Sequence, residues 1–121
     1  MKTLITLIAT LTATATLASD VEIVDVQASQ SGGAWRFDVT LRHADSGWEH
    51  YADGWEVLAP DGSSLGMRVL AHPHVNEQPF TRSLSGVMIP EGITNVVIRA
   101  RDNVDGWTVE TYPMALPAER E

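Results

Sequence analysis

The chain is 121 residues long and acidic, with 16 aspartates and glutamates against eight lysines and arginines, for a net charge of −8. A surface of that sign repels phosphate backbones and anionic lipid, which argues against nucleic acid and membrane partners and favours cations. The sequence has no cysteine, which excludes disulfides, thiolate catalysis and cysteine-ligated metals. Such acidity would also keep a protein soluble in a salty medium without any partner.

The first 18 residues are typical of a secretory signal peptide. Lys2 supplies one positive charge, an apolar run follows, and small residues surround the expected cleavage site after Ala18 or Ser19. A membrane anchor is the alternative, but threonines interrupt the run, which is short for a membrane span of ~20 residues. We therefore expect an exported protein, periplasmic or secreted, with no membrane insertion after the leader is removed.

The rest of the chain is long enough for one domain, which we expect over residues 19–117, followed by a flexible tail over residues 118–121. The domain consists of short apolar runs separated by turn residues, without sustained helical periodicity, and this pattern predicts β-strands. In chain order the expected strands cover residues 21–28, 35–41, 51–59, 65–71, 80–89, 96–101 and 107–112.

The second run is the clearest, because Trp35, Phe37, Val39 and Leu41 alternate with polar residues, so that one face is core and the other solvent. His43 continues the buried parity where this strand ends. Between the third and fourth runs, Pro60-Asp61-Gly62 predicts a tight turn in which proline presets φ and glycine takes a positive φ.

Seven such strands with a core-facing tryptophan on the third, Trp55, resemble an immunoglobulin-like or fibronectin-type-III-like domain. The resemblance covers residues 20–116. It implies an all-β fold, a seven-stranded antiparallel β-sandwich of Greek-key type, in an exported bacterial protein. We also expect Trp35 and Trp107 in the core. Folds of this kind host many functions, so the resemblance does not indicate an activity.

All four histidines lie in two polar segments that an antiparallel strand order places at one end of the sandwich, together with several acids. Imidazole nitrogens combined with a carboxylate suit Zn²⁺ or Cu²⁺. The alternative for each histidine is a hydrogen-bonded loop residue that fixes its neighbours. The sequence thus predicts a zinc or copper site with these candidate ligands: His72, His74, His43 and His50, with Glu77 or Asp45 as the oxygen ligand.

Trp48 and Tyr51 flank His50 in the first of these polar segments. An exposed aromatic pair beside carboxylates suits the ring of a glycan or an apolar anchor of a protein partner, whereas Trp48 could instead fold over the sandwich end as a lid. No serine lies in a hydrolase-type strand-to-helix turn, so we expect a binding protein and not an enzyme. The two open functions are therefore a metal-binding module and a protein- or glycan-interaction module in which the histidines are structural.

Overall fold

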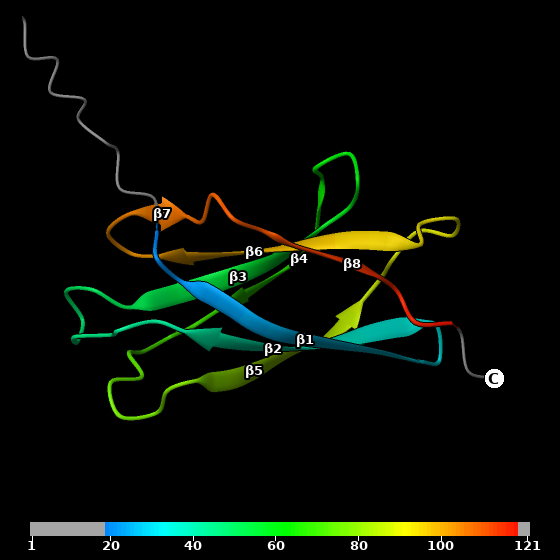
Figure 1. Ribbon diagram of the computed structural model, residues 1–121. Helices are drawn as coiled ribbons and strands as arrows, with labels where there is room; N and C mark the ends of the chain where they lie inside the picture. The colour runs from blue at the N-terminus through cyan, green and yellow to red at the C-terminus, as the bar shows by residue number, and fades with distance from the viewer. Residues whose placement is uncertain (1–18, 119–121) are drawn as a thin grey trace, which may run out of the picture.

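The computed structural model describes residues 19–118, and this part of the chain is all-β, without a helix (Figure 1). The expected leader and residues 119–121 lie outside the described residues. Two antiparallel sheets are formed, one in the order β1-β2-β5 and the other in the order β4-β3-β6-β7, with β8 also paired to β6. The strands are β1 (Glu22–Ser31), β2 (Ala34–Arg42), β3 (Ala52–Leu58), β4 (Ser64–Val69), β5 (Phe80–Val87), β6 (Asn95–Asp102), β7 (Gly106–Trp107) and β8 (Tyr112–Ala115).

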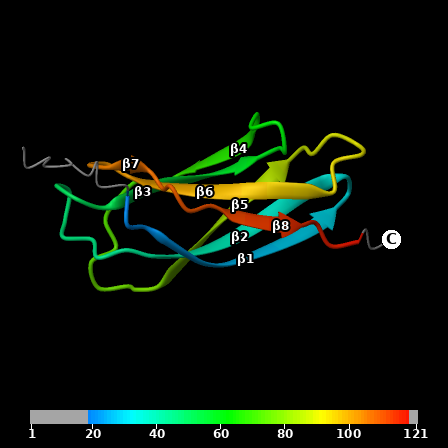
Figure 2. The same ribbon diagram turned by 45° about the horizontal axis from the view of Figure 1, so that its top comes forward.

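The two sheets lie in separate layers that face each other, as the two views show (Figures 1 and 2). Their inner faces share one core, whose largest fully buried side chains include Trp55 from β3, Phe37 from β2 and Ile98 from β6. Because the chain has no disulfides, burial of the apolar side chains of this core is its main stabilising contribution. The expected all-β class is confirmed.

The alternation predicted for the second run is also confirmed. Trp35, Phe37, Val39 and Leu41 of β2 are buried, while the intervening residues are not. His43 keeps the inward parity one residue beyond the end of β2, and it is buried as well. In the turn before β4, Gly62 has a φ of 87°, a left-handed value that glycine adopts without steric cost.

The expected seven strands are eight, because the run at 107–112 does not form one strand. Backbone pairing with β6 stops after Trp107 and resumes at Tyr112, so β7 and β8 both pair with β6 but are separate.

Trp107 was expected in the core, and that expectation is wrong. Trp107 is the cross-strand partner of Arg101, and such partners point to the same side of a sheet. Its ring therefore lies on the outer face, 3.8 Å beneath the Arg99 guanidinium.

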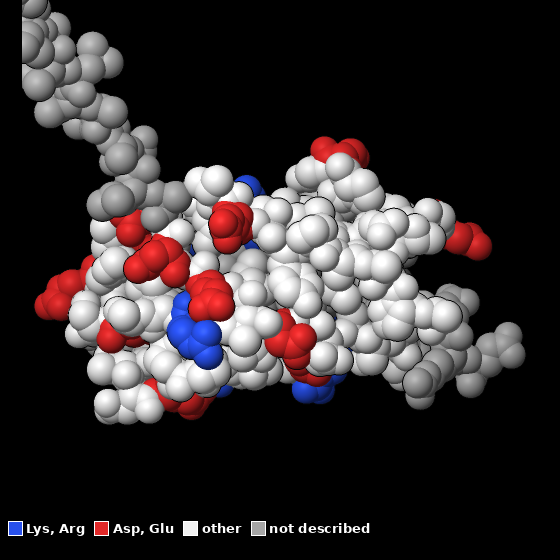
Figure 3. All heavy atoms as spheres, viewed as in Figure 1, with Lys and Arg blue, Asp and Glu red and all other residues white. Residues whose placement is uncertain are grey.

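The ends of the sandwich differ in chemistry. The segments at residues 43–51, 70–79 and 102–106 lie together at the left of Figure 1, whereas the turns at 59–63 and 88–94 lie toward the opposite end. We call the first of these the histidine end, since it carries all four histidines. Acidic side chains gather near this end on the face that Figure 3 shows, so an approaching cation meets an attractive field there.

Candidate metal site

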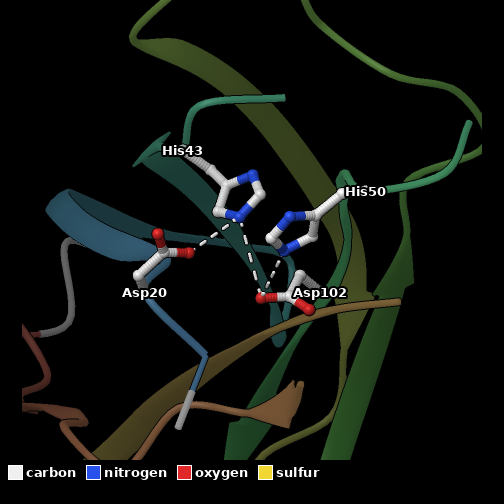
Figure 4. Close-up of side chains that lie close together, drawn as sticks. All are labelled: Asp20, His43, His50 and Asp102. Carbon is white, nitrogen blue, oxygen red and sulfur yellow. Dashed lines mark ion pairs between the residues drawn. The ribbon is translucent and has the colours of Figure 1, made fainter. Parts of the chain in front are cut away.

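Two histidines and two aspartates meet at the histidine end (Figure 4). Asp20, His43, His50 and Asp102 each offer one ligand atom, and these four atoms lie within 4.8 Å of one another. His43 Nε2 is 2.9 Å from an Asp20 oxygen and 3.7 Å from Asp102 Oδ2. His50 Nε2 is 3.5 Å from the same Asp102 oxygen. We call these four residues the His–Asp cluster.

Strand parity accounts for the two buried members of the cluster. His43 follows β2 in the inward position, and Asp102 ends β6 on the parity of the buried Val96, Ile98 and Ala100. The side chains of His43 and Asp102 are both fully buried. Burying the Asp102 carboxylate next to the inward-facing apolar residues of β6 costs free energy unless the charge is paired, so its presence points to a specific partner.

Asp45 fixes the orientation of the His43 ring. Its Oδ1 lies 2.5 Å from His43 Nδ1 and also accepts a hydrogen bond from the Ala52 N–H, at 3.0 Å. Its Oδ2 accepts from the His74 N–H at 2.8 Å. With Nδ1 engaged by the carboxylate, the ring directs Nε2 into the cluster. Carboxylates commonly orient metal-binding histidines in this way.

Asp102 is held by several donors. Its Oδ1 accepts from the backbone N–H groups of Val104 and Asp105, at 2.9 and 2.6 Å, and its Oδ2 accepts from the Ser19 hydroxyl at 2.7 Å. Burial acts to raise the pKa of Asp102, but these hydrogen bonds, with the Asp105 N–H first, outweigh it and leave the pKa below its ordinary value. The carboxylate is therefore ionised at neutral pH and is available to a cation.

The two Nε2 atoms of the cluster are buried, and neither makes a hydrogen bond of acceptable geometry with any described residue. The carboxylates around them outnumber the imidazoles, since Asp45 lies behind His43 and Asp105 lies 3.5 Å from His50 Nε2. Even with both rings protonated, the group would keep an excess of negative charge. A divalent cation would satisfy both nitrogens and offset that charge at once.

The dimensions of the cluster suit one transition-metal ion. Zn²⁺ binds four imidazole nitrogens and carboxylate oxygens tetrahedrally at ~2.0–2.2 Å, so its ligand atoms lie ~3.3–3.6 Å from one another. The separations of 2.9, 3.7 and 3.5 Å within the cluster are near that range. The upper limit of 4.8 Å over all pairs is wider, so the most distant pair would have to close by about 1 Å around an ion. The residues present therefore fit Zn²⁺ or Cu²⁺.

Of the six ligands predicted from the sequence, two lie in the cluster, one supports it and three lie outside it. His43 and His50 belong to the cluster, and Asp45 supports His43 from behind. His72, His74 and Glu77 do not belong to the metal-ligand group found among residues 19–118. His72 is exposed and directs Nδ1 to the Pro73 carbonyl, and Glu77 accepts a hydrogen bond from Arg82 at 2.9 Å.

His74 has the surroundings of an interior residue. Its ring stacks on Phe80, with centroids 4.0 Å apart and planes inclined by 11°. Burial, then the positive charges of Arg82 and His72, lower the pKa of His74 below its ordinary value of 6.5. Its ring is therefore neutral at physiological pH, and its backbone N–H, through Asp45, connects the 72–79 segment to His43.

Sequence reasoning did not assign Asp20 or Asp102 as ligands. Asp102 had a usable signal, because it occupies the inward parity of the run at 96–101 at its histidine end. Asp20 had none, since it precedes the first strand and its side chain reaches the cluster only through the path of the folded backbone (Figure 4).

The aromatic pair predicted as a ligand platform lies beside the cluster. Trp48 is 66% exposed, so its alternative role as a lid over the sandwich end is wrong. Its ring meets Tyr51 edge to face, with centroids 5.7 Å apart. The Asn103 amide donates to the Trp48 carbonyl at 3.0 Å and accepts from the Tyr51 N–H at 2.8 Å, which holds this loop in one conformation.

Comparison with known proteins gives one similarity. The chain is 44% identical over 89 residues to a protein of Halomicrobium mukohataei named "Putative lipoprotein", and the match covers 73% of this chain and 43% of that protein. The chain thus spans less than half the length of the curated relative it matches. No family model matches the sequence. No solved structure matches it either. Among the described residues, no helix is long and apolar enough to cross a membrane.

Proposed function

We propose that this chain is an exported, non-enzymatic β-sandwich module that binds one Zn²⁺ or Cu²⁺ ion through the His–Asp cluster. The observation that carries the proposal is the convergence of the buried Nε2 atoms of His43 and His50 on the ionised carboxylate of Asp102, with the Asp20 carboxylate also beside His43. Neither nitrogen makes a well-aligned hydrogen bond with a described residue, and a single cation would bind both.

The ligand set favours binding over catalysis. Asp20, His43, His50 and Asp102 together supply four ligand atoms, which is the full coordination of a structural zinc ion. A catalytic zinc keeps one position open for water or substrate, and four protein ligands would fill it. The Asp45 carboxylate behind His43 supplies the supporting hydrogen bond that such sites use.

Two observations support export, and the sheet order supports the fold subtype. The pattern of residues 1–18 is that of a secretory leader, and the similar protein carries a lipoprotein name. We therefore propose a periplasmic or secreted location.

The division of the strands into β1-β2-β5 and β4-β3-β6-β7 is compatible with a Greek-key, immunoglobulin-like sandwich, which we also propose.

The alternative function is a protein- or glycan-interaction module that uses Trp48 and Tyr51. The exposed Trp48 ring on a loop that Asn103 holds in place favours it, because a fixed aromatic surface loses little entropy on binding. In that case the histidines would be structural. The two functions use neighbouring but different groups, so variants can separate them.

The test of the metal proposal is titration of chelator-treated protein, purified without a histidine tag, with Zn²⁺ and Cu²⁺ in a calorimeter. We expect one ion per chain and loss of the binding heat in the double variant His43→Ala/His50→Ala. His72→Ala is the matched control, because it removes an exposed histidine at the same end, and it should bind as the wild type does. Absence of heat in the wild type would contradict the metal function. Loss of heat in His72→Ala, with retention in the double variant, would instead assign the ion to the 72–79 segment.

A further inference from the structure

The four ligands of the His–Asp cluster come from both sheets. Asp20 precedes β1 and His43 follows β2, and both strands belong to the three-stranded sheet. His50 precedes β3 and Asp102 ends β6, and both of these belong to the five-stranded sheet. An ion bound by all four would therefore connect the two layers of the sandwich at their histidine end.

The segment before β1 has few attachments of its own. Ser19 donates its hydroxyl to Asp102, and Val21 buries its side chain in the core. Asp20 lies between them with its side chain 70% exposed, and its contact with the cluster is to His43 Nε2, at 2.9 Å. Ser19 and Asp20 thus contact the cluster, whereas the core holds Val21, so the cluster is the anchor of the first two described residues.

Charge opposes the attachment when no ion is bound. Asp20 and Asp102 both approach His43 Nε2, at 2.9 and 3.7 Å, and these two neighbouring carboxylates repel each other. A divalent cation between them reverses the sign of the interaction, because each carboxylate then faces two positive charges.

We propose that the bound ion is a clamp: it docks the segment at residues 19–21 through Asp20 and thereby joins the two sheets where a disulfide is absent. This inference rests on the proposed metal-binding function and adds the role of the ion. Asp20 is the last ligand to close, since it is the exposed member of the cluster. Release of the ion therefore begins with the undocking of residues 19–21.

The test is hydrogen–deuterium exchange, followed by mass spectrometry, of the chain with and without Zn²⁺. Exchange that requires loss of the ion is slowed about 100-fold when free Zn²⁺ is 100 times its dissociation constant. We expect slowing of that order in peptides covering residues 19–23 of the wild type. In Asp20→Asn, Zn²⁺ should still bind in the calorimeter, more weakly. The slowing of exchange that Zn²⁺ causes in residues 19–23 of the wild type should be lost in this variant.

Glu91→Gln is the matched control, because it removes one exposed carboxylate in the turn at the opposite end of the sandwich. It should keep both binding and the protection of residues 19–23. If Zn²⁺ binds the wild type but leaves exchange at 19–23 unchanged, the clamp is refuted while the metal-binding function stands. If Zn²⁺ does not bind at all, the proposed function itself fails. Equal protection in the wild type and Asp20→Asn would also refute the clamp.

Discussion

Replacing Asp45 by Asn tests the support of the cluster most directly. Asp45 is buried, and both of its oxygens act as acceptors: Oδ1 for the His43 ring and the Ala52 N–H, and Oδ2 for the His74 N–H. An asparagine has nearly the same size but only one oxygen. Whichever way its amide is turned, an NH₂ group will face at least one of these donors.

The magnitude follows from those contacts. A buried donor left without its acceptor costs ~1–3 kcal/mol, and here the NH₂ group also points at that donor. We therefore expect Asp45→Asn to lower the free energy of unfolding of the metal-free protein by ~2–4 kcal/mol. Because the His43 ring loses its fixed orientation, metal affinity should also fall, by about 10–100-fold.

Urea denaturation of the metal-free protein measures the first effect, and calorimetric titration with Zn²⁺ measures the second. Glu91→Gln serves again as the control, with an expected change in unfolding free energy within ~0.5 kcal/mol and unchanged affinity. A variant Asp45→Asn that matched the wild type in both measurements would refute the view that this carboxylate orients the site.

Two further predictions concern the fold. Trp55→Ala should destabilise by ~3–5 kcal/mol because it empties a fully buried site in the core, whereas Thr40→Ala on the outer face of β2 should cost far less; the reverse ranking by urea denaturation would mean that the faces are misassigned. For His74, the folded pKa is below the ordinary 6.5, so the unfolded chain takes up the proton first and stability falls as pH drops below 6.5. His74→Phe, which can keep the stack on Phe80, should flatten that part of the stability curve; an unchanged curve would show that another group causes it.

The sequence was sufficient to predict the fold class because strand alternation is a local property. The pattern from Trp35 to Leu41 predicts that His43 faces inward, and the burial of its side chain confirms this. Alternation could not show where a strand is interrupted, so the single run expected at 107–112 is in fact β7 and β8. The apolar character of Trp107 also could not show on which face of the sheet it lies, because its register with Arg101 decides that. On the outer face, the Arg99 guanidinium covers the Trp107 ring, a role that a core side chain would have on the inner face.

For the candidate site, the sequence predicted the end of the molecule at which the His–Asp cluster lies and two of its four residues, His43 and His50. Spacing favoured His72 and His74, which are two residues apart, but whether a ring faces a cluster or stacks on Phe80 depends on the local path of the loop. The cluster brings together Asp20 and Asp102, which lie near opposite ends of the domain's sequence. Such a pair can be assigned only when the strand order and register are known.

The exposed position of Trp48 gives the molecule a built-in optical signal. Trp35 and Trp55 are buried and should emit at short wavelength, and Trp107 is half-buried beneath Arg99. Trp48, at 66% exposure, should emit furthest to the red and be the most open to a soluble quencher such as iodide. Trp48 lies two residues before His50, on the loop that Asn103 holds in place. Occupancy of the cluster by Cu²⁺, a strong fluorescence quencher, should therefore reduce the red-shifted, iodide-accessible part of the tryptophan emission, without any added label.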